Sequence, residues 1–326
     1  MGTRSIGIGK ETSFATKATP DKFFDLTTHS LTAEREPLLA ETIAYRAVRD
    51  AWPGPVRITG SLEGILDANI AARLLYSAVT EVSTSDDGES PPTAYKHEFT
   101  PAQSVNTVTI SADDGESSEI PYFLGCAVRS LEIRAEARAL VTFTADILGA
   151  KVKLDSPINP TFDHITPFIF HQSTVTRAGN DITNRVQSFS ITVENDIPDD
   201  AHVLGSMYLP RMWAQGLSVT GEIELQFLDW EDYKRFLGSA TATEFQSTME
   251  SFTLKLTLLG GDTGSSAAGF DKYKLEIDIP KAYYLESEVH FERRERIVQT
   301  IRWRGVHDTT SGYPIKFTVI NKNSEP

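Results

Sequence analysis

Apolar and polar residues alternate along most of the chain, in short stretches separated by polar turns. A period of two is typical of a strand with one buried face. In the first half the pattern predicts strands at Val56–Gly64, Val105–Ser111, Tyr122–Ala137 and Leu140–Leu154. In the second half it predicts strands at Val186–Glu194, Leu217–Phe227, Phe252–Leu259, Tyr273–Ile279, Glu288–Phe291, Ile297–Arg304 and Ile315–Ile320. The pattern indicates a mainly β protein built from antiparallel sandwiches or open barrels.

Two stretches instead repeat apolar residues with the period of a helix. Asp67 precedes the first stretch, Ala68–Thr80, and Asp229 precedes the second, Trp230–Ala240. Aspartate is a favourable N-cap because its carboxylate accepts hydrogen bonds from the free N–H groups of the first turn. Each stretch carries one apolar face, formed by Ile70, Leu74 and Leu75 in the first and by Tyr233, Phe236 and Leu237 in the second. One helix is therefore expected in each half.

The chain also repeats itself. Val56–Gly64 (VRITGSLEG) recurs as Leu217–Leu225 (LSVTGEIEL), with an offset of 161 residues from Gly60 to Gly221. Three further matches follow in the same order: the two predicted helices at an offset of 162, Leu131–Arg138 with Val289–Arg296 at 158, and Val141–Ile147 with Ile297–Trp303 at 156. Single strands resemble one another by chance, but four ordered matches indicate a tandem duplication.

The duplication predicts a mainly β fold of two tandem antiparallel β-sandwich or open-barrel units, each with one flanking α-helix. Residues 1–156 are expected to form the first unit and residues 168–326 the second. Residues 157–167 contain three prolines, Pro157, Pro160 and Pro167, and we interpret them as the linker.

Composition limits what such a fold can do. The 326 residues are 40% hydrophobic, enough for a sizeable core, and 31 Lys and Arg against 45 Asp and Glu give a net charge of −14. Basic residues are scattered, apart from Arg293–Arg296, which Glu295 interrupts, so a sequence-specific DNA reader or a membrane-surface binder is not expected. No apolar run reaches the roughly 18 residues of a membrane span, and Met1–Thr28 lacks the apolar region of a signal peptide. We therefore expect a soluble protein made in a cytoplasm.

Candidate catalytic chemistry is sparse. Gly7–Thr12 departs from a phosphate-binding loop because Glu11 follows Lys10 and no apolar strand is predicted before it. The single cysteine, Cys126, lies in an apolar stretch, where a buried structural thiol is expected. No histidine pair has metal-ligand spacing, and no G-x-S-x-G elbow is present. We predict no catalytic, cofactor or metal site, although the paired carboxylates of a glycosidase leave no spacing signal and stay open as an alternative.

Two acidic clusters are candidate cation sites or candidate turns. They consist of Asp86, Asp87 and Glu89, and of Asp113, Asp114 and Glu116. Both lack the alternating oxygen ligands and the terminal glutamate of an EF-hand loop. Solvated turns are therefore the favoured interpretation.

The opening of the chain carries a different signal. Ser5–Thr16 (SIGIGKETSFAT) is followed by Ala18-Thr19-Pro20, by Leu31–Leu38, and then by Ile58–Glu63 (ITGSLE). This order resembles the N-terminal region of tail tube proteins of long-tailed bacteriophages, with Ala15 in place of the more usual glycine. The resemblance is detailed in the N-terminal part of the chain and follows the general pattern beyond it.

The resemblance implies a structural virion protein of the viral tail, made in the host cytoplasm, with no enzymatic activity and no cofactor. Members of this family form rings of six units that stack into a hollow tube, so a duplicated chain would close a ring with three copies. The implied partners are the chain itself, a tape measure protein, and tail terminator or baseplate proteins, with no membrane. Double-stranded DNA would pass through the lumen without specific binding. The charge of −14 suits a lumen that repels phosphate, although solubility explains it equally well.

Within this interpretation, residues 31–55 are too rich in Glu, Arg and Pro for a core element and are expected to reach the adjacent ring. Glu34, Arg35, Arg46 and Arg49 are the candidate contacts between rings or subunits. Two other classes stay open. One is another virion β-sandwich protein, such as a capsid decoration or a baseplate or tail adaptor protein, and the other is a carbohydrate-binding or hydrolytic β-sandwich.

Overall fold

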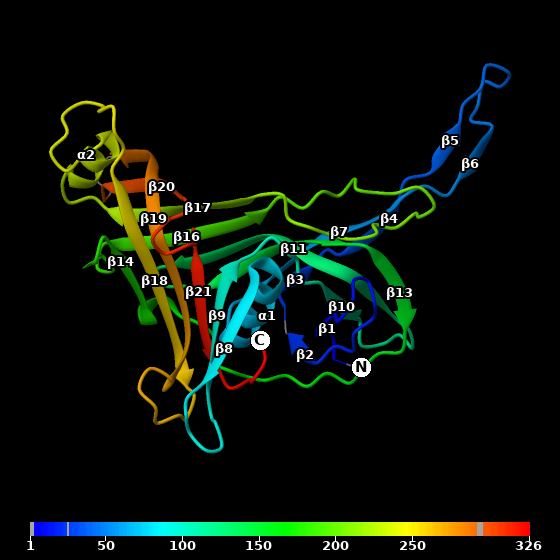
Figure 1. Cartoon of the computed structure of the whole chain (residues 1–326), viewed down its shortest axis with the longest axis horizontal. Helices are drawn as coiled ribbons and strands as arrows, with labels where there is room; N and C mark the ends of the chain where they lie inside the picture. Colours follow the sequence, from blue (N-terminus) through cyan, green and yellow to red (C-terminus); the bar gives the residue numbers. More distant parts are fainter. Residues whose placement is uncertain (1–2, 25, 292–295) are drawn as a thin grey trace.

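The computed structural model of the chain describes residues 3–24, 26–291 and 296–326, which form a mainly antiparallel β structure with two α-helices (Figure 1). The strands of the first half are β1 (Ser5–Lys10), β2 (Lys22–Phe24), β3 (Thr28–His29), β4 (Thr32–Arg35), β5 (Leu38–Ala40), β6 (Asp50–Trp52), β7 (Val56–Ile65), β8 (Thr80–Asp86), β9 (Tyr95–Pro101), β10 (Val108–Asp113), β11 (Ile120–Glu136), β12 (Thr142–Gly149) and β13 (Lys151–Asp155). Those of the second half are β14 (Ser173–Arg177), β15 (Asn180–Asp181), β16 (Val186–Asn195), β17 (Leu217–Gln226), β18 (Ser251–Asp262), β19 (Lys272–His290), β20 (Val298–Gly305) and β21 (Lys316–Asn321). The helices are α1 (Ala68–Ala78) and α2 (Glu231–Leu237), and a 3-10 turn, η1, covers Phe170–Gln172.

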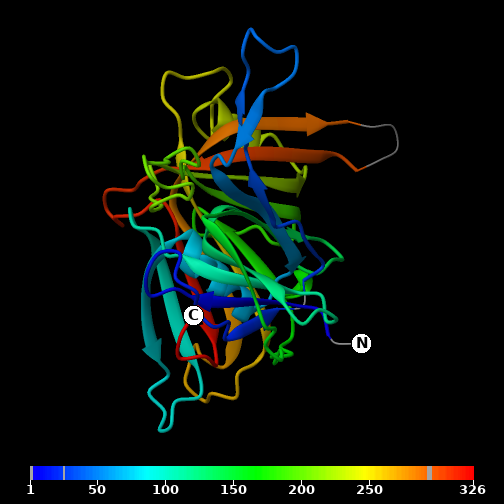
Figure 2. The same cartoon turned by 90° about the vertical axis from the view of Figure 1, so that its right-hand side faces the viewer.

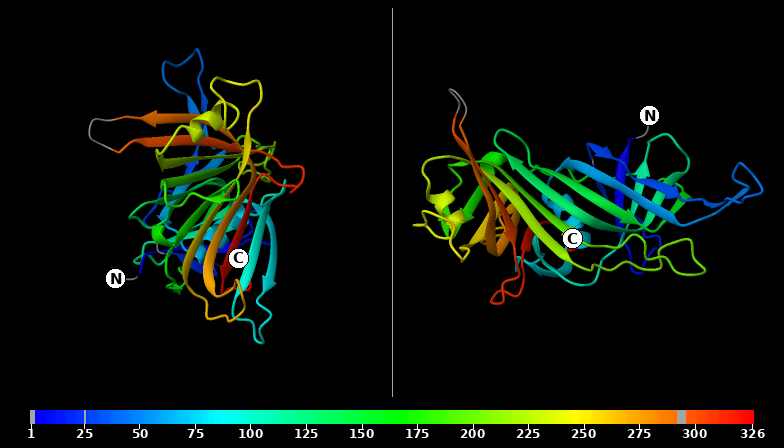
Figure 3. Two further views of the ribbon diagram at one scale, coloured as in Figure 1. Left: turned by 90° about the vertical axis from the view of Figure 1, so that its left-hand side faces the viewer. Right: turned by 90° about the horizontal axis from the view of Figure 1, so that it is seen from above.

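One antiparallel sheet runs through both halves of the chain (Figure 3). Its strand order is β4, β7, β12, β11, β16, β17, β20 and β19. β3 extends the edge formed by β4, because both strands pair with β7. The halves join where β11 pairs with β16, with Glu132 opposite Thr192. We name this sheet the central sheet and the β11–β16 contact the internal junction.

The long strands β11 and β19 leave the central sheet and continue into a second layer. The first part of β11 pairs with β10 and β13, and β10 leads on to β1 and β2. The first part of β19 pairs with β18 and β21, and β18 leads on to β14 and β15. The pairing order β2–β1–β10–β11–β12–β7–β4 thus recurs as β15–β14–β18–β19–β20–β17–β16. The hairpin β8–β9, which pairs with β21, has no counterpart among the described strands of the second half.

The repeated glycine of the sequence marks the same close approach in both halves. A Cβ at Gly60 would lie 2.5 Å from the carbonyl oxygen of Ser30, and a Cβ at Gly221 would lie 2.4 Å from that of Ser190. Ser30 lies between β3 and β4, and Ser190 lies in β16. A side chain at either glycine would push the neighbouring strand away, which explains why both copies of the motif carry glycine.

Strand pairing corrects one offset of the predicted repeat. The bulge that follows Val128 in β11 has its counterpart in the bulge that follows Tyr284 in β19. Counted from these bulges, Leu131 corresponds to Ser287, an offset of 156 and not 158. A slip of two residues leaves every side chain on its own face, so the alternating pattern could not distinguish the two registers. Residues 292–295, which belong to the predicted match, lie outside the described residues.

The helix α1 lies at the centre of the molecule (Figure 1) and is capped as predicted. The Asp67 carboxylate accepts hydrogen bonds from the backbone N–H groups of Asn69 at 2.8 Å and Ile70 at 2.9 Å. Every residue of α1 except Tyr76 is buried. The helix contacts β8, β9 and β11 of its own half and β19 and β21 of the second half. It therefore packs against both halves at once.

The helix α2 is shorter than predicted and is capped differently. It ends before Gly238, whose φ of 131° only glycine adopts readily. Trp230 holds the N-cap position without a side-chain cap bond, although Asp229 still accepts a hydrogen bond from the N–H of Glu231 at 2.8 Å. Within α2 only Asp232 and Leu237 are buried.

Several strand boundaries also differ from the prediction. The predicted strand Leu140–Leu154 is divided into β12 and β13. The alternating pattern predicts Tyr273–Ile279 and Glu288–Phe291 as separate strands, whereas β19 is continuous from Lys272 to His290 and includes Pro280. The alternating pattern does not predict β1, because two of its six residues, Gly7 and Gly9, have no side chain. A Cβ at Gly7 would lie 2.6 Å from the Ser111 hydroxyl, so this strand needs its glycines.

Candidate functional site

One face of the central sheet covers the core, and the other face is polar. Its charged positions alternate with buried core positions along each strand. The acidic members of this polar face are Glu34, Glu63, Glu132, Glu136, Asp146, Glu194, Glu222, Glu224, Glu286 and Glu288, and the basic members are Arg57, Arg129, Arg134, Arg302 and Arg304. The described residues that form the central sheet, with β19 counted from Ala282 where it begins to pair with β20, include no lysine. Such a surface repels polyanions instead of gathering them.

Three arginines of the polar face are paired with carboxylates of the protein. The Arg302 guanidinium lies 2.9 Å from Glu222 on β17 and also contacts Glu286 on β19. Its hydrogen bond lowers the pKa of Glu286 below the ordinary value. Two further pairs on this face follow the same scheme: Arg134 with Glu136 at 3.5 Å and Arg57 with Asp199 at 2.7 Å. These three cations are therefore largely neutralised by their neighbours, whereas the described residues form no ion pair with Arg129 or Arg304.

The central sheet ends in two edges that lack a partner within the described part of the chain. At one end, β3 and β4 pair with β7 and with no other described strand. At the other end, Glu286–His290 of β19 pairs with β20 alone. Unpaired N–H and C=O groups at a sheet edge form a template for another strand. We name these ends the β4 edge (Thr28–Arg35) and the β19 edge (Glu286–His290).

The β4 edge contains a signal that alternation alone did not reveal. Thr28–Glu34 reads THSLTAE, and Ser188–Glu194 of β16 reads SFSITVE, at an offset of 160. Both segments occupy the same place, one against β7 and the other against β17. The sequence pattern does not reveal this likeness, because it predicts residues 31–55 as one connection. In the structure, residues 32–35 form a strand.

Beyond β4, the predicted loop is a projecting hairpin. β5 and β6 form a separate two-stranded sheet, with Leu38 opposite Trp52, that extends away from the body (Figures 1 and 2). Large apolar side chains of this hairpin are exposed, namely Leu38, Leu39, Ile43, Tyr45, Val48 and Trp52. An apolar cluster on a projecting element is typical of a binding surface.

The four candidate contact residues fall in two places. Glu34 and Arg35 lie on the β4 edge, and Arg46 and Arg49 lie in the hairpin. All four are exposed. The Arg49 N–H donates to the carbonyl of Ala40 at 2.9 Å, and this hydrogen bond helps to close the hairpin. The structure therefore does not bring the four together as one site.

A second exposed apolar surface surrounds α2. Its side chains are between 45% and 70% exposed and comprise Leu228, Trp230, Phe245, Met249, Leu285 and Phe291. The Trp230 ring lies 5.1 Å from the Phe227 ring and 5.4 Å from that of Tyr233, both in edge-to-face contact. Because Phe291 directly follows β19 and lies 6.4 Å from Trp230, this α2 surface adjoins the β19 edge.

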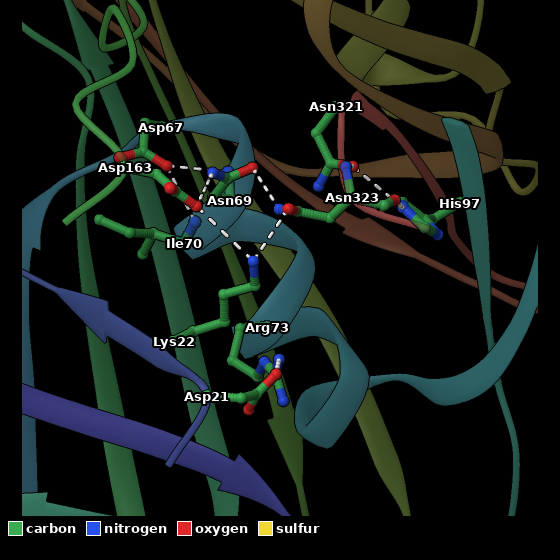
Figure 4. A network of polar contacts seen from close by, with 10 residues as sticks. All are labelled: Asp21, Lys22, Asp67, Asn69, Ile70, Arg73, His97, Asp163, Asn321 and Asn323. Atoms are coloured by element: carbon green, nitrogen blue, oxygen red, sulfur yellow. Dashed lines mark hydrogen bonds and ion pairs between the residues drawn. The ribbon is translucent and has the colours of Figure 1, made fainter. Parts of the chain in front are cut away.

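A polar network joins segments that are distant in sequence around α1 (Figure 4). Asn69 of α1 donates to Asp163 at 3.5 Å and accepts from Asn323 at 2.9 Å. Lys22 of β2 donates to Asn323 at 2.9 Å and lies 3.6 Å from Asp163. The His97 ring of β9 bonds to the Asn323 carbonyl at 3.0 Å. The network fixes α1 against the segment between the two halves and against the last residues of the chain.

The two acidic clusters form hydrogen-bonded turns. Asp114 accepts from the hydroxyl of Ser117 at 2.6 Å and from the N–H of Glu116 at 3.0 Å, which lowers its pKa to about 2. Further bonds of the same kind include those donated by the N–H groups of Gly88 to Asp86, of Ala94 to Asp87, of Ser266 to Glu89 and of Gly115 to Asp113. Among the described residues, no group of three or more His, Cys, Asp or Glu side chains is placed to hold a metal ion.

The remaining candidate residues lie in the core. Lys10 ends β1, and the Glu11 carboxylate accepts from the hydroxyls of Thr107 and Thr109 and from the N–H of Gly125, each at 2.8 Å. The segment is therefore an anchored strand and not a phosphate-binding loop. Cys126 is fully buried, as expected, and its burial raises the pKa of its thiol well above the ordinary value.

A family profile described as "Phage tail tube protein" matches residues 3–304. No curated protein matches the chain significantly. In the described part of the chain, the helices are too short or too polar to span a membrane.

Proposed function

The chain belongs to the phage tail tube protein family, and we propose that three copies close a ring and that such rings stack into the tube through which the viral genome passes. The family is a structural one, so the chain is a self-assembling component of the virion tail and not an enzyme. Synthesis in the host cytoplasm and the number of copies per ring belong to the proposal.

The proposed building block is a two-layered unit with one helix, present twice in each chain. The first unit covers residues 1–156 and the second covers residues 168–326. The recurring strand order of the two halves supports this division. Residues 157–167 serve as the linker, in agreement with their lack of strand or helix.

Closure of the ring is supported by the two edges of the central sheet. Within one chain, the internal junction already joins the first unit to the second. In the proposed ring, the β19 edge of one copy pairs with the β4 edge of the next. Three copies then supply six units, and internal and intermolecular junctions alternate around the ring. One continuous sheet with a free edge in each half is the observation that carries the proposal.

In this arrangement the polar face of the central sheet lines the lumen. Phosphate groups of passing DNA meet carboxylates, hydroxyls and arginines, three of which are ion-paired, and no lysine of the described part of the sheet. Because carboxylates outnumber the arginines on this face, few cations can replace the counterions of DNA, and the wall gains little from binding it. The duplex therefore slides without being held.

Stacking is assigned to the hairpin Leu38–Trp52. Its apolar side chains dock on the adjacent ring, and Arg46 and Arg49 pair with acidic residues there. Deletion of Glu41–Asp50 removes the tip of the hairpin but no residue of the core. We expect the deletion variant to remain folded by circular dichroism and to form rings without long tubes. Long tubes of normal stability would exclude this role.

The other proposed partners follow from the family resemblance. A tape measure protein occupies the lumen during assembly, and tail terminator and baseplate proteins bind the two ends of the tube.

Electron microscopy and mass measurement of the purified protein test the proposal. Negative-stain images should show hollow tubes at high protein concentration, and the smallest closed ring should have three times the chain mass of 36.0 kDa. A ring of six chains would refute the stoichiometry alone. A protein that stays monomeric at every concentration would refute the tube.

The charge of the lumen has its own test. Thr192→Lys and Thr220→Lys each add a cation to the polar face, and Thr310→Lys adds the same charge to an exposed turn elsewhere. Tubes of the first two variants should retain duplex DNA in a salt-dependent way, and the control should not. Equal retention by all three would show that this face is not the lumen wall.

A further inference from the structure

We infer that the junction between two copies has the same strand register as the internal junction, with Glu288 of one copy opposite Thr32 of the next. The inference rests on the proposed ring and specifies which residues meet in it. Its source is the internal junction, which shows how the two kinds of edge fit together.

The internal junction is antiparallel and regular. Its pairs run from Ser130 opposite Glu194 to Glu136 opposite Ser188 without a shift in register. The pair Glu132–Thr192 lies between these limits, with both side chains on the polar face.

Both strands of the internal junction have counterparts at the free edges. β19 corresponds to β11 at an offset of 156, which the shared bulge fixes. The β4 edge corresponds to β16 at an offset of 160, which the pairing with β7 and β17 fixes. Applied to the internal pairs, the two offsets give the intermolecular pairs Glu286–Glu34, Ser287–Ala33, Glu288–Thr32, Val289–Leu31 and His290–Ser30.

The polar face supports this register. The pair Glu288–Thr32 has the same residue types as the internal pair Glu132–Thr192. Its neighbour in the inferred register, Glu286–Glu34, places two carboxylates together, but the Arg302 guanidinium already pairs with Glu286. Like charges directly opposite one another cost little when one of them is neutralised in this way.

The core face supports the same register. Val289 meets Leu31 in the inferred pairing, as Ile133 meets Ile191 in the internal junction. Leu31 is buried in the single chain, on the side of the sheet that covers the core. A shift of one residue would bring side chains of opposite faces together, and a shift of two toward the start of β19 would place Leu31 against Ser287. A shift of two in the other direction would place Leu31 against Phe291, beyond the end of β19, and would lose the pair of Glu288 with Thr32.

Arg35 acquires a positioning role from this register. It lies opposite Val56 as Asn195 lies opposite Leu217. The buried Asn195 amide donates to the carbonyl of Ala78 at 2.7 Å and to that of Val128 at 3.2 Å, next to the end of α1. At the intermolecular junction, Arg35 stands in the place of Asn195, beside the carbonyl of Tyr284 and near the end of α2. A guanidinium is well suited there because it offers several N–H donors to carbonyl groups.

The register also provides a cover for the α2 surface. In the chain, α1 packs against β19 and β21 of the following unit. The counterparts of these strands in a first unit are β11 and β13. The α2 surface therefore faces β13 of the next copy, where Leu154 is 60% exposed. The apolar side chains around α2 become buried without any further partner.

Cysteine pairs test the register in assembled tubes. Two double variants place cysteines at positions that are opposite in the inferred register: Glu288→Cys/Thr32→Cys and His290→Cys/Ser30→Cys. Two others place them two residues out of register: Glu288→Cys/Ser30→Cys and His290→Cys/Thr32→Cys. Opposite residues of an antiparallel pair have Cα atoms about 4.5–5.5 Å apart, within the range of a disulfide, and diagonal neighbours lie about 7–8 Å apart, beyond it. Glu132→Cys/Thr192→Cys is the matched control, because it should form the same bond within one chain. The four single-cysteine variants control for the buried Cys126.

We expect both in-register pairs to form interchain disulfides at least about tenfold more than both displaced pairs, since only they satisfy disulfide geometry. The cross-linked products should be dimers and closed trimers. Tubes in which the displaced pairs cross-link equally or better would overturn the register and leave the proposed function intact. A wild-type protein that forms no tubes, together with variants that form no interchain bond, would overturn both.

Arg35 is tested by rescue. Arg35→Ala should raise the protein concentration needed for tube formation by about tenfold or more, as expected when a buried carbonyl loses its donor. Arg35→Asn, which installs the residue of the internal junction, should recover most of that loss, while Arg46→Ala should leave ring formation unchanged. Equal defects in Arg35→Ala and Arg35→Asn, or no defect in either, would remove Arg35 from the junction.

Discussion

The helices α1 and α2 occupy the same place in the repeated strand order but differ greatly in burial. α1 has eleven residues, all buried except Tyr76, whereas α2 has seven, of which only Asp232 and Leu237 are buried. The difference lies in the strands that are available to cover each helix. α1 packs against strands of the second half, whereas α2 packs against β19 of its own half. Burial of α1 therefore depends on the junction between the two halves of the chain and not on its own half alone.

The corresponding arginines of the two helices differ in burial in the same way. The Arg73 side chain of α1 is 1% exposed and donates to Asp21 at 2.8 Å. Arg235, its counterpart on α2, is 26% exposed and pairs with Glu231 at 2.8 Å and with Glu250. A cation in the centre of the molecule depends on its partner, whereas a cation near the surface is also stabilised by water.

The largest effect is expected from a charge placed in the middle of α1. Leu75 has no exposed surface, so Leu75→Asp buries a carboxylate without a partner and should lower the free energy of unfolding by at least about 4 kcal/mol. Leu75→Met, which conserves volume, should cost less than about 1.5 kcal/mol. Denaturant unfolding measures both, and a loss below about 2 kcal/mol for Leu75→Asp would contradict the central position of α1.

The corresponding substitution in α2 should cost less. Leu237 is 9% exposed and lies on a short helix, so the carboxylate of Leu237→Asp can turn toward water. We expect a loss of about 2–3 kcal/mol in the single chain. A loss of unfolding free energy equal to that of Leu75→Asp would show that the second half buries α2 without a neighbouring chain. That result would contradict the difference in burial between α1 and α2.

The caps of the helices predict a difference in pH dependence. Burial raises the pKa of Asp67 to about 6, against the opposing effect of the N–H groups of Ile70 and Asn69. The pKa of Asp67 is therefore higher in the folded state than in the unfolded state, where it is about 4. The contribution of Asp67 to stability is greatest below about pH 4 and is lost as the pH rises through about 6. Because Asp67 is only partly buried, the loss should be about 1–2 kcal/mol. Asp67→Asn keeps a capping side chain. The variant should be as stable as wild type near pH 4, which is about the pKa of aspartate in the unfolded chain, and more stable than wild type near neutral pH.

Unfolding of Asp67→Asn and wild type across this pH range measures the effect, with Asp229→Asn at the exposed start of α2 as the matched control. An unchanged pH profile in Asp67→Asn would assign the dependence to other groups.

The smallest effect on the single chain is expected at the α2 surface. Trp230 is 45% exposed, so Trp230→Ala should change the free energy of unfolding by less than about 1 kcal/mol. In the proposed ring the same side chain is buried, and the variant should assemble only at a higher protein concentration. Phe245→Ala should behave similarly. Normal assembly of both variants would show that the α2 surface stays exposed in the tube.

Local chemistry explains which parts of the fold could be predicted. The alternation along Val56–Gly64 and the cap at Asp67 depend only on residues that are close in sequence. The structure confirms the strand and the helix that they predict. Alternation does not predict the β4 edge, because Thr28–Glu34 has few apolar residues and most of its side chains are exposed. Its likeness to Ser188–Glu194 becomes visible only when both are aligned against β7 and β17. The pairing of β11 with β16 is formed by backbone groups, which every sequence supplies equally.

The internal junction changes the mass action of ring closure. Its two edges are carried by one chain, so they meet at an effective concentration set by the linker 157–167 and not by the amount of protein in solution. A ring of six separate units must recruit six free molecules, whereas the proposed ring recruits three, and each recruitment costs translational and rotational freedom. Dilution should therefore dissolve a ring of duplicated chains less readily than a ring of single units. In the proposed ring of duplicated chains, half of ring closure is a folding step instead of an association step.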